Sequence, residues 1–188
     1  GSHSHEATSP ERYRNVTPVT VPNAEWYAAY TFARREKKAQ ASLREYGFES
    51  YLPCVPRVRQ WHDRKKVVEF PLFAGYIFVR FPPQRLHVLL DVPGVVYIVR
   101  ANGQLASIGN AEIENIARFV SGLERSGVEP AQVTFAEGHI VRVTEGPFQG
   151  VEGVVLQRRG RRRVLVGIRS IGIGFEVNID NRLLQRVA

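Results

Sequence analysis

The sequence lacks the features that mark several common classes of protein. Its 188 residues include a single cysteine, Cys54, which excludes an internal disulfide bond and a metal site built from several cysteines. No apolar run approaches the roughly 20 residues that a transmembrane helix needs, and no apolar signal-peptide core stands near the N-terminus. We therefore expect a cytoplasmic protein without a membrane-spanning segment.

Motifs for catalysis and metal binding are also missing. The histidines His62, His87 and His139 are far apart, and no pair has the short spacing of a metal site. There is no phosphate-binding loop, nucleophile elbow or clustered pair of carboxylates. Cys54 lies in a stretch typical of a half-buried strand, which favours a structural role for its thiol. These absences predict a protein that is not an enzyme and needs no cofactor or metal.

What the sequence has in excess is positive charge. It contains 26 lysine and arginine residues against 18 aspartate and glutamate residues, a formal net charge of +8 at pH 7. Such an excess favours polyanionic surroundings such as DNA, RNA or a ribonucleoprotein particle. The charge is spread along the chain, which indicates a protein that contacts nucleic acid while something else holds it.

Hydrophobic periodicity divides the chain into two domains. Residues 1–23 begin with Gly-Ser-His and show little periodicity, so we expect a tag remnant and a flexible tail. Residues 24–126 mix strand-like and helix-like stretches, which predicts an α+β domain with an antiparallel sheet flanked by helices. A polar stretch, 127–134, predicts a short linker. Residues 135–188 contain short strand-like segments with glycines at their corners, which predicts a small β-barrel.

The first domain is expected to contain three helices, over residues 34–46, 82–90 and 110–123, the last capped by Asn110. Strand-like stretches flank a polar segment, 60–66, that we interpret as a turn. The pair Asn102-Gly103 predicts a second, tight turn.

The C-terminal stretch Glu137 to Val155 resembles the KOW motif, the first hairpin of a small SH3-like barrel. Its glycines Gly146 and Gly153 suit backbone angles that are closed to other residues. Ribosomal proteins and elongation factors share this motif. Two classes therefore remain open at this point: a transcription elongation factor, and a ribosome-associated RNA-binding protein.

The N-terminal domain resembles the NGN domain of the NusG family of bacterial transcription elongation factors. Four motifs carry the resemblance in order and spacing: Trp26 to Tyr30, Glu36 to Ala39, Phe70 to Val79, and Val92 to Val95. A ribosomal KOW protein has no reason to carry them. The basic stretch Arg57 to Lys66 is most similar to specialised paralogues, the RfaH and polysaccharide-operon (UpxY-like) antiterminators, with a housekeeping NusG as the alternative.

The resemblance implies a monomer that binds the clamp helices of the RNA polymerase β′ subunit, suppresses pausing and recruits partners through its KOW domain. It places the polymerase-binding surface at Tyr30, Phe73 and Tyr76. An ordinary core position is the alternative for all three. From the sequence alone the core is favoured for Tyr76, which lies in a dense apolar strand.

Two groups of residues are candidates for contact with nucleic acid. The resemblance implies that Arg34, Arg35, Lys37 and Lys38, at the start of the first helix, face the non-template DNA of the elongation complex. A solvated helix face is an equal alternative. Trp61 either stacks on an exposed base or covers the sheet, and we favour the second interpretation.

In the KOW domain, the resemblance places partner contacts at Phe148 and Ile171. The partners it implies are a small-subunit ribosomal protein or the termination factor Rho. Ile171 stands where the family has an aromatic residue, and Ile173 where it has a basic one. These departures weaken the expectation of Rho binding more than that of ribosome binding.

Overall fold

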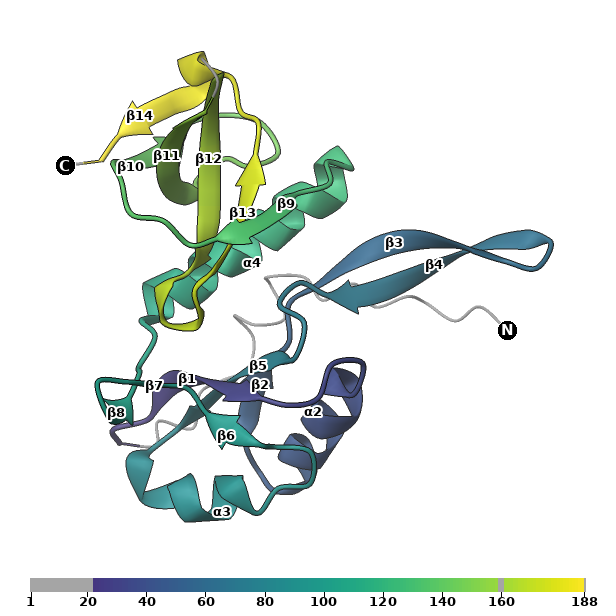
Figure 1. The fold of residues 1–188 in the computed structure, drawn as a ribbon, viewed down its shortest axis with the longest axis vertical. Helices are drawn as coiled ribbons and strands as arrows, with labels where there is room; N and C mark the ends of the chain where they lie inside the picture. The colour runs from purple at the N-terminus through teal and green to yellow at the C-terminus, as the bar shows by residue number, and fades with distance from the viewer. Residues whose placement is uncertain (1–21, 159–160, 188) are drawn as a thin grey trace.

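The computed structural model describes residues 22–158 and 161–187, so the predicted tail lies almost wholly outside the described part. The chain forms an N-terminal α+β domain and a C-terminal β-domain (Figure 1). In the described part, none of the helices is both long and apolar enough to span a membrane.

A four-stranded antiparallel sheet, in the order β2-β5-β1-β6, forms the centre of the N-terminal domain. Its strands are β1 (Glu25–Tyr30), β2 (Glu49–Tyr51), β5 (Tyr76–Phe81) and β6 (Tyr97–Ile98). Because side chains alternate along a strand, β1 sends Trp26 and Ala28 into one core and Tyr27 and Ala29 into another. The sheet is therefore buried on both faces, as the aromatic run predicts.

Helices cover the two faces of this sheet. On one face α2 (Glu36–Glu45) and α3 (Leu86–Leu90), which follows a 3-10 turn (Pro83–Arg85), contribute apolar side chains to one core. On the other face α4 (Asn110–Ser126) packs its apolar stripe. All three predicted helices are present, because each carries an apolar stripe of helical period.

Helix starts differ from the prediction in two places. Arg34 has a positive φ of 71° and Arg35 is the N-cap of α2, so both precede the helix. Gly109, not Asn110, is the N-cap of α4, with no side-chain cap.

The predicted turn at Asn102-Gly103 is confirmed, because both residues have positive φ and join β7 (Arg100–Ala101) to β8 (Gln104–Leu105).

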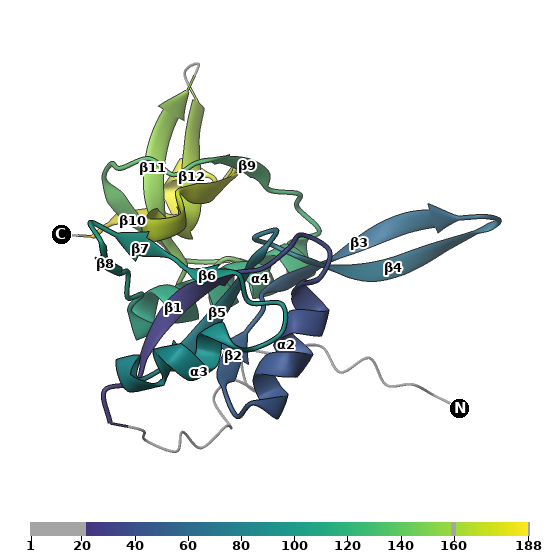
Figure 2. The same cartoon turned by 60° about the horizontal axis from the view of Figure 1, so that its bottom comes forward.

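The polar turn predicted over 60–66 is present, but it is shorter than expected. Two long strands, β3 (Cys54–Trp61) and β4 (Arg64–Pro71), pair along their whole length and leave only His62 and Asp63 between them. Figures 1 and 2 show this hairpin extending away from the rest of the molecule. The strand ends beside the turn are exposed on both faces and show no apolar alternation, so the sequence pattern assigned them to the turn.

The C-terminal domain is a six-stranded antiparallel sheet in the order β14-β10-β11-β12-β13-β9. Its strands are β9 (Ala131–Thr134), β10 (Ile140–Val143), β11 (Glu152–Arg158), β12 (Arg161–Ile168), β13 (Ile173–Val177) and β14 (Leu184–Arg186). Strand β9 occupies half of the predicted linker and pairs with β13. It is a mostly exposed edge strand, which explains why its sequence reads as polar.

Helix α4 lies between the two domains (Figures 1 and 2). One continuous core cluster includes Phe73 of the N-terminal domain, Phe119 of α4, and Phe148 and Phe175 of the C-terminal domain. The two domains are therefore packed together through apolar contacts.

Candidate functional site

Three tyrosines from neighbouring strands form a cluster at the end of the N-terminal sheet. The ring of Tyr30 stacks on Tyr97, with centroids 4.9 Å apart, and meets Tyr76 edge-on at 5.4 Å. Tyr97 is 45% exposed, and the other two are half-buried. Burial, followed by its tyrosine neighbours, raises the pKa of Tyr76, so its hydroxyl stays protonated at neutral pH.

Phe32 follows Tyr30 by two residues and is 59% exposed, so we group it with the three tyrosines. We call Tyr30, Phe32, Tyr76 and Tyr97 the aromatic surface. Sequence reasoning missed Phe32 and Tyr97. The register that places Tyr97 opposite Tyr30 was the missing signal, because β6 has only two residues and no pattern of its own.

A tight turn fixes the aromatic surface to α2. Gly75 has φ 86°, and a Cβ there would lie 3.1 Å from the ring of Tyr30. Its carbonyl accepts a hydrogen bond from the N–H of Thr31 at 2.7 Å. Its own N–H donates to the buried carboxylate of Glu36 at 3.2 Å. Only glycine combines this backbone angle with this close approach.

Phe73, the remaining residue of the predicted polymerase surface, is not accessible in this structure. It is 1% exposed, and its ring contacts Phe78 at 5.6 Å and Phe175 of the C-terminal domain at 5.2 Å. The expectation of a surface position for Phe73 is therefore wrong for this domain arrangement. The sequence pattern contains no information on how the second domain docks.

Phe148, predicted to bind a partner, is buried in the same interdomain contact. Its ring lies 5.8 Å from that of Phe119 on α4. A Cβ on Gly122 of α4 would lie only 2.4 Å from the Phe148 ring, so the glycine permits the close approach. Ile171 lies in a 3-10 turn (Arg169–Ile171) and is half-buried against the same core cluster.

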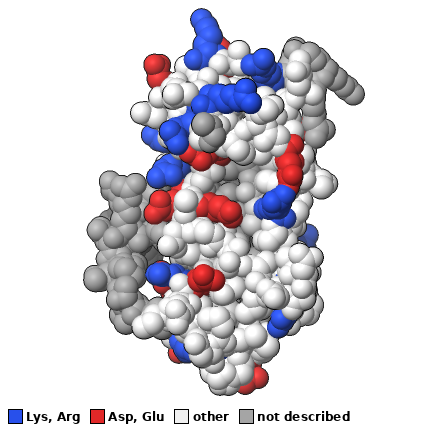
Figure 3. All heavy atoms as spheres, turned by 90° about the vertical axis from the view of Figure 1, so that its left-hand side faces the viewer, with Lys and Arg blue, Asp and Glu red and all other residues white. Residues whose placement is uncertain are grey.

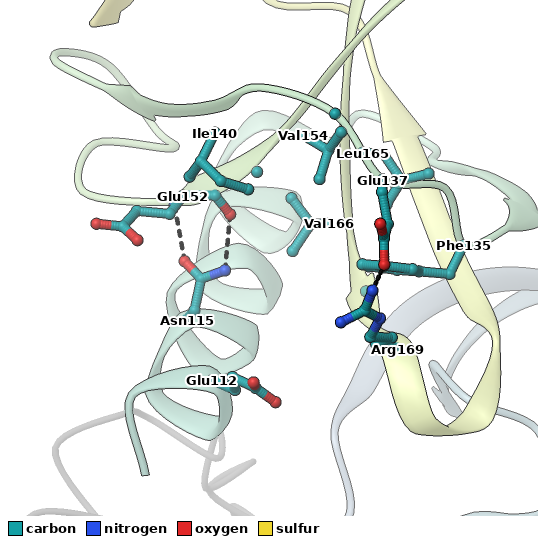
Figure 4. Close-up of a pocket in the computed structure, with 13 residues that line it drawn as sticks. Glu112, Asn115, Phe135, Glu137, Ile140, Glu152, Val154, Leu165, Val166 and Arg169 are labelled. Atoms are coloured by element: carbon teal, nitrogen blue, oxygen red, sulfur yellow. Dashed lines mark hydrogen bonds and ion pairs between the residues drawn. The ribbon is translucent and has the colours of Figure 1, made fainter. Parts of the chain in front are cut away.

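Polar contacts complete the joint between the domains (Figure 4). The amide of Asn115 on α4 donates to the carbonyl of Glu152 and accepts from its N–H, both at 2.7 Å. Arg125 donates to the carbonyl of Pro147 at 2.7 Å. Beside these contacts lies a cleft of about 470 Å³, crossed by the ion pair of Arg169 and Glu137. The bonds of Asn115 to Glu152 and of Arg169 to Glu137 connect residues that line this cleft, which fits a domain joint.

The four basic residues of the α2 region, Arg34, Arg35, Lys37 and Lys38, are all exposed. None of them forms an ion pair with another residue in the described ranges 22–158 and 161–187. Cations at a helix N-terminus oppose the helix dipole and cost stability. Their side chains are therefore available to an anion from outside the chain.

On one face of the molecule the positive charge lies mainly on the C-terminal domain. Figure 3 shows a face on which Lys and Arg gather over the C-terminal domain at the top, while the N-terminal domain below is sparsely charged.

Burial raises the pKa of the Cys54 thiol to about 11. Because the thiolate is the nucleophile, this cysteine is unreactive near neutral pH, as a structural role requires.

A family model described as "Transcription termination factor nusG" matches residues 24–117, which include the aromatic surface and the Gly75 turn. The chain belongs to the NusG family. The transcription termination/antitermination protein NusG of Thermus thermophilus is 31% identical to it, over 77% of this chain and 89% of that protein. The protein of the same name from Vibrio vulnificus is 29% identical, over 79% and 88%.

Among solved structures, one described as "Domain interaction in Thermotoga maritima NusG" has a TM-score of 0.48 and 22% identity. The match covers 88% of this chain and 98% of that one. As a member of the NusG family, shown by the family model and the relatives above, this chain is a transcription termination/antitermination factor and not an enzyme. The relatives named here do not distinguish a specialised paralogue from the housekeeping factor.

Proposed function

We propose that this chain is a NusG of the housekeeping type that holds the β′ clamp helices of RNA polymerase and shortens pauses. The relatives reported above are named NusG, so we adopt the housekeeping role in place of the specialised paralogue that the basic hairpin favoured. The aromatic surface is the observation that carries the proposal. Exposed aromatic rings with wet hydroxyls are the usual anchors of protein interfaces.

The domain joint adds a condition to this proposal. Phe175 of the C-terminal domain covers Phe73, and Phe119 of α4 covers Phe148, so neither Phe73 nor Phe148 reaches a partner while the domains are packed together. The C-terminal domain therefore has to leave α4 before Phe73 joins the polymerase contact. The same step frees Phe148 and Ile171 for a small-subunit ribosomal protein or Rho.

The polymerase contact is tested by truncating the exposed rings. Tyr97→Ala and Phe32→Ala should each weaken binding to an isolated β′ clamp-helix fragment by about fivefold or more, as interface anchors do. Calorimetry measures the affinity. Phe32 is largely exposed, so its replacement should change the free energy of unfolding by less than about 0.5 kcal/mol. Tyr97→Ala also removes the stacking on Tyr30 and should cost about 0.5–1.5 kcal/mol.

Leu90→Ala is the matched control for these variants, because Leu90 is a large exposed apolar residue elsewhere on the N-terminal domain. It should bind the fragment like the natural chain. Equal affinity for all four proteins would show that the aromatic surface is not the contact. The proposed clamp binding would then be wrong in its location.

Contact with the non-template DNA strand is the second part of the proposal. Replacing Arg34, Arg35 and Lys38 with glutamine should flatten the salt dependence of binding to an assembled elongation complex. Each lost phosphate contact with a single strand lowers the log–log slope by about 0.7. Arg44→Gln, at the other end of α2, is the control and should leave the slope unchanged. An unchanged slope in the triple variant would indicate a solvated helix face.

A further inference from the structure

The β3–β4 hairpin is an arm that the function proposed above leaves unused. From Arg57 to Lys66 every residue is exposed, and Figures 1 and 2 show the arm standing clear of both domains. Trp61 near its tip is 60% exposed, so the expectation that it covers the sheet is wrong. A shallow hollow lies beside Trp61 and Arg64. An exposed tryptophan on a free arm is available to a ligand.

The strand register separates the arm into two unlike faces. Directly opposed residues share a face, and side chains alternate between faces along each strand. One face, here called the basic face, carries four cations and two aromatic rings: Arg57, Arg59, Trp61, Arg64, Lys66 and Phe70. The opposite face carries one cation and one anion, Lys65 and Glu69, beside two exposed valines. The positive charge is therefore one-sided.

This arrangement is unfavourable for the hairpin by itself. Arg59 lies directly opposite Lys66, and like charges in that position destabilise a strand pair. None of the basic-face cations forms an ion pair with any residue that the structure describes. Instead, Arg59 lies 4.7 Å from the centre of the Phe70 ring and Lys66 lies 5.2 Å from that of Trp61. Surface charges that serve only solubility usually include both cations and anions. The cations of the basic face have no anion beside them on that face.

We propose that the basic face is a binding site for single-stranded nucleic acid. Its cations contact the phosphates, and Trp61 stacks on an unpaired base. Cations interleaved with exposed aromatic rings are the combination that binds single strands without reading their sequence. The site is distinct from the α2 region and needs no polymerase, so its test stands apart from that of the proposed function.

The stacking part is tested with the whole chain and a single-stranded oligothymidylate of about twelve nucleotides, within the usual size of such sites. Trp61→Ala should weaken binding on the order of five- to 150-fold, the measured range for loss of one stacked base. Trp61→Phe keeps a ring and should retain most of the affinity. The strand should also quench the emission of Trp61, whereas Trp26, 1% exposed, serves as an internal reference.

The phosphate part is tested by two adjacent lysines on opposite faces. Lys66→Gln should lower the log–log slope of affinity against salt concentration by about 0.7. Lys65→Gln removes the same charge from the other face and should leave the slope unchanged. Arg59→Gln combined with Lys66→Gln should lower it by about 1.4. Unchanged unfolding midpoints show that each variant is folded.

Three results would overturn the proposal. Equal effects of the two lysine variants would show that only the net charge of the arm matters. Tighter binding to a blunt duplex of the same length, with no effect of Trp61→Ala, would replace the single strand with duplex DNA. Absence of binding to the single strand at about 50 mM salt, where phosphate contacts are strong, would remove the site altogether. None of these results bears on clamp binding by the aromatic surface.

Discussion

Replacing Gly122 with leucine should separate the two domains and raise the affinity of the whole chain for the β′ clamp-helix fragment by about tenfold or more. A side chain at Gly122 collides with the Phe148 ring and with the carbonyl of Pro147, so the C-terminal domain can no longer dock on α4. The substitution also improves the helix propensity of α4 by roughly 1 kcal/mol. The N-terminal domain should therefore remain folded.

The magnitude follows from the contacts that are lost. Each interdomain aromatic pair contributes about 0.5–1.5 kcal/mol beyond its buried area, and each hydrogen bond of Asn115 contributes a similar net amount, about 0.5–1.5 kcal/mol. A closed joint reduces the apparent affinity by the fraction of open molecules. If the substitution removes about 1.4 kcal/mol from the free energy that favours the docked domains, the apparent affinity for the clamp-helix fragment rises about tenfold.

Two measurements accompany this experiment. Small-angle scattering should show a larger radius of gyration for Gly122→Leu, and Ala111→Leu, exposed on the same helix, should match the natural chain. The fragment 22–126 should bind the clamp helices as tightly as Gly122→Leu does. If the natural chain already binds as tightly as the fragment, the C-terminal domain does not restrict the surface.

Phe73→Ala should lower the free energy of unfolding of the whole chain by about 3–5 kcal/mol, the usual cost of removing a fully buried phenylalanine. The sequence-based view of Phe73 as an exposed anchor predicts a far smaller change. Denaturant unfolding measures the difference. The loss should be smaller in the fragment 22–126, because the contact with Phe175 is already absent there.

Phe32→Ala is the matched control, since it removes the same side chain from a largely exposed position. It should change the free energy of unfolding by less than about 0.5 kcal/mol. A loss below about 1 kcal/mol for Phe73→Ala would mean that Phe73 is exposed in solution and that the domains are apart.

Much of the fold could be predicted from the sequence, because the apolar residues of a buried helix or strand recur at a regular spacing. The stripe from Ile113 to Leu123 predicts α4, and the aromatic run from Trp26 to Tyr30 predicts the central strand. Exposed elements carry no such signal. The residues at the tip of the β3–β4 arm were assigned to a longer turn and β9 to a linker, since neither segment buries a regular apolar face.

The candidate site was only partly predictable. Tyr30 and Tyr76 are adjacent, yet Tyr97 joins them only through the register of β6. The basic residues Arg34 and Arg35 belong to a turn and a cap because φ at Arg34 is positive, a backbone choice that no periodicity reveals.

By itself the sequence determined the family, the two domains and the excess of positive charge, because each depends on residue order and composition alone. Tertiary structure decided which of those residues a partner can reach. Phe73 and Phe148 are core residues while the C-terminal domain is docked on α4, and they can bind a partner only when it is not. Likewise, Lys65 and Lys66 are neighbours in sequence, and strand pairing sends them to opposite faces of the arm.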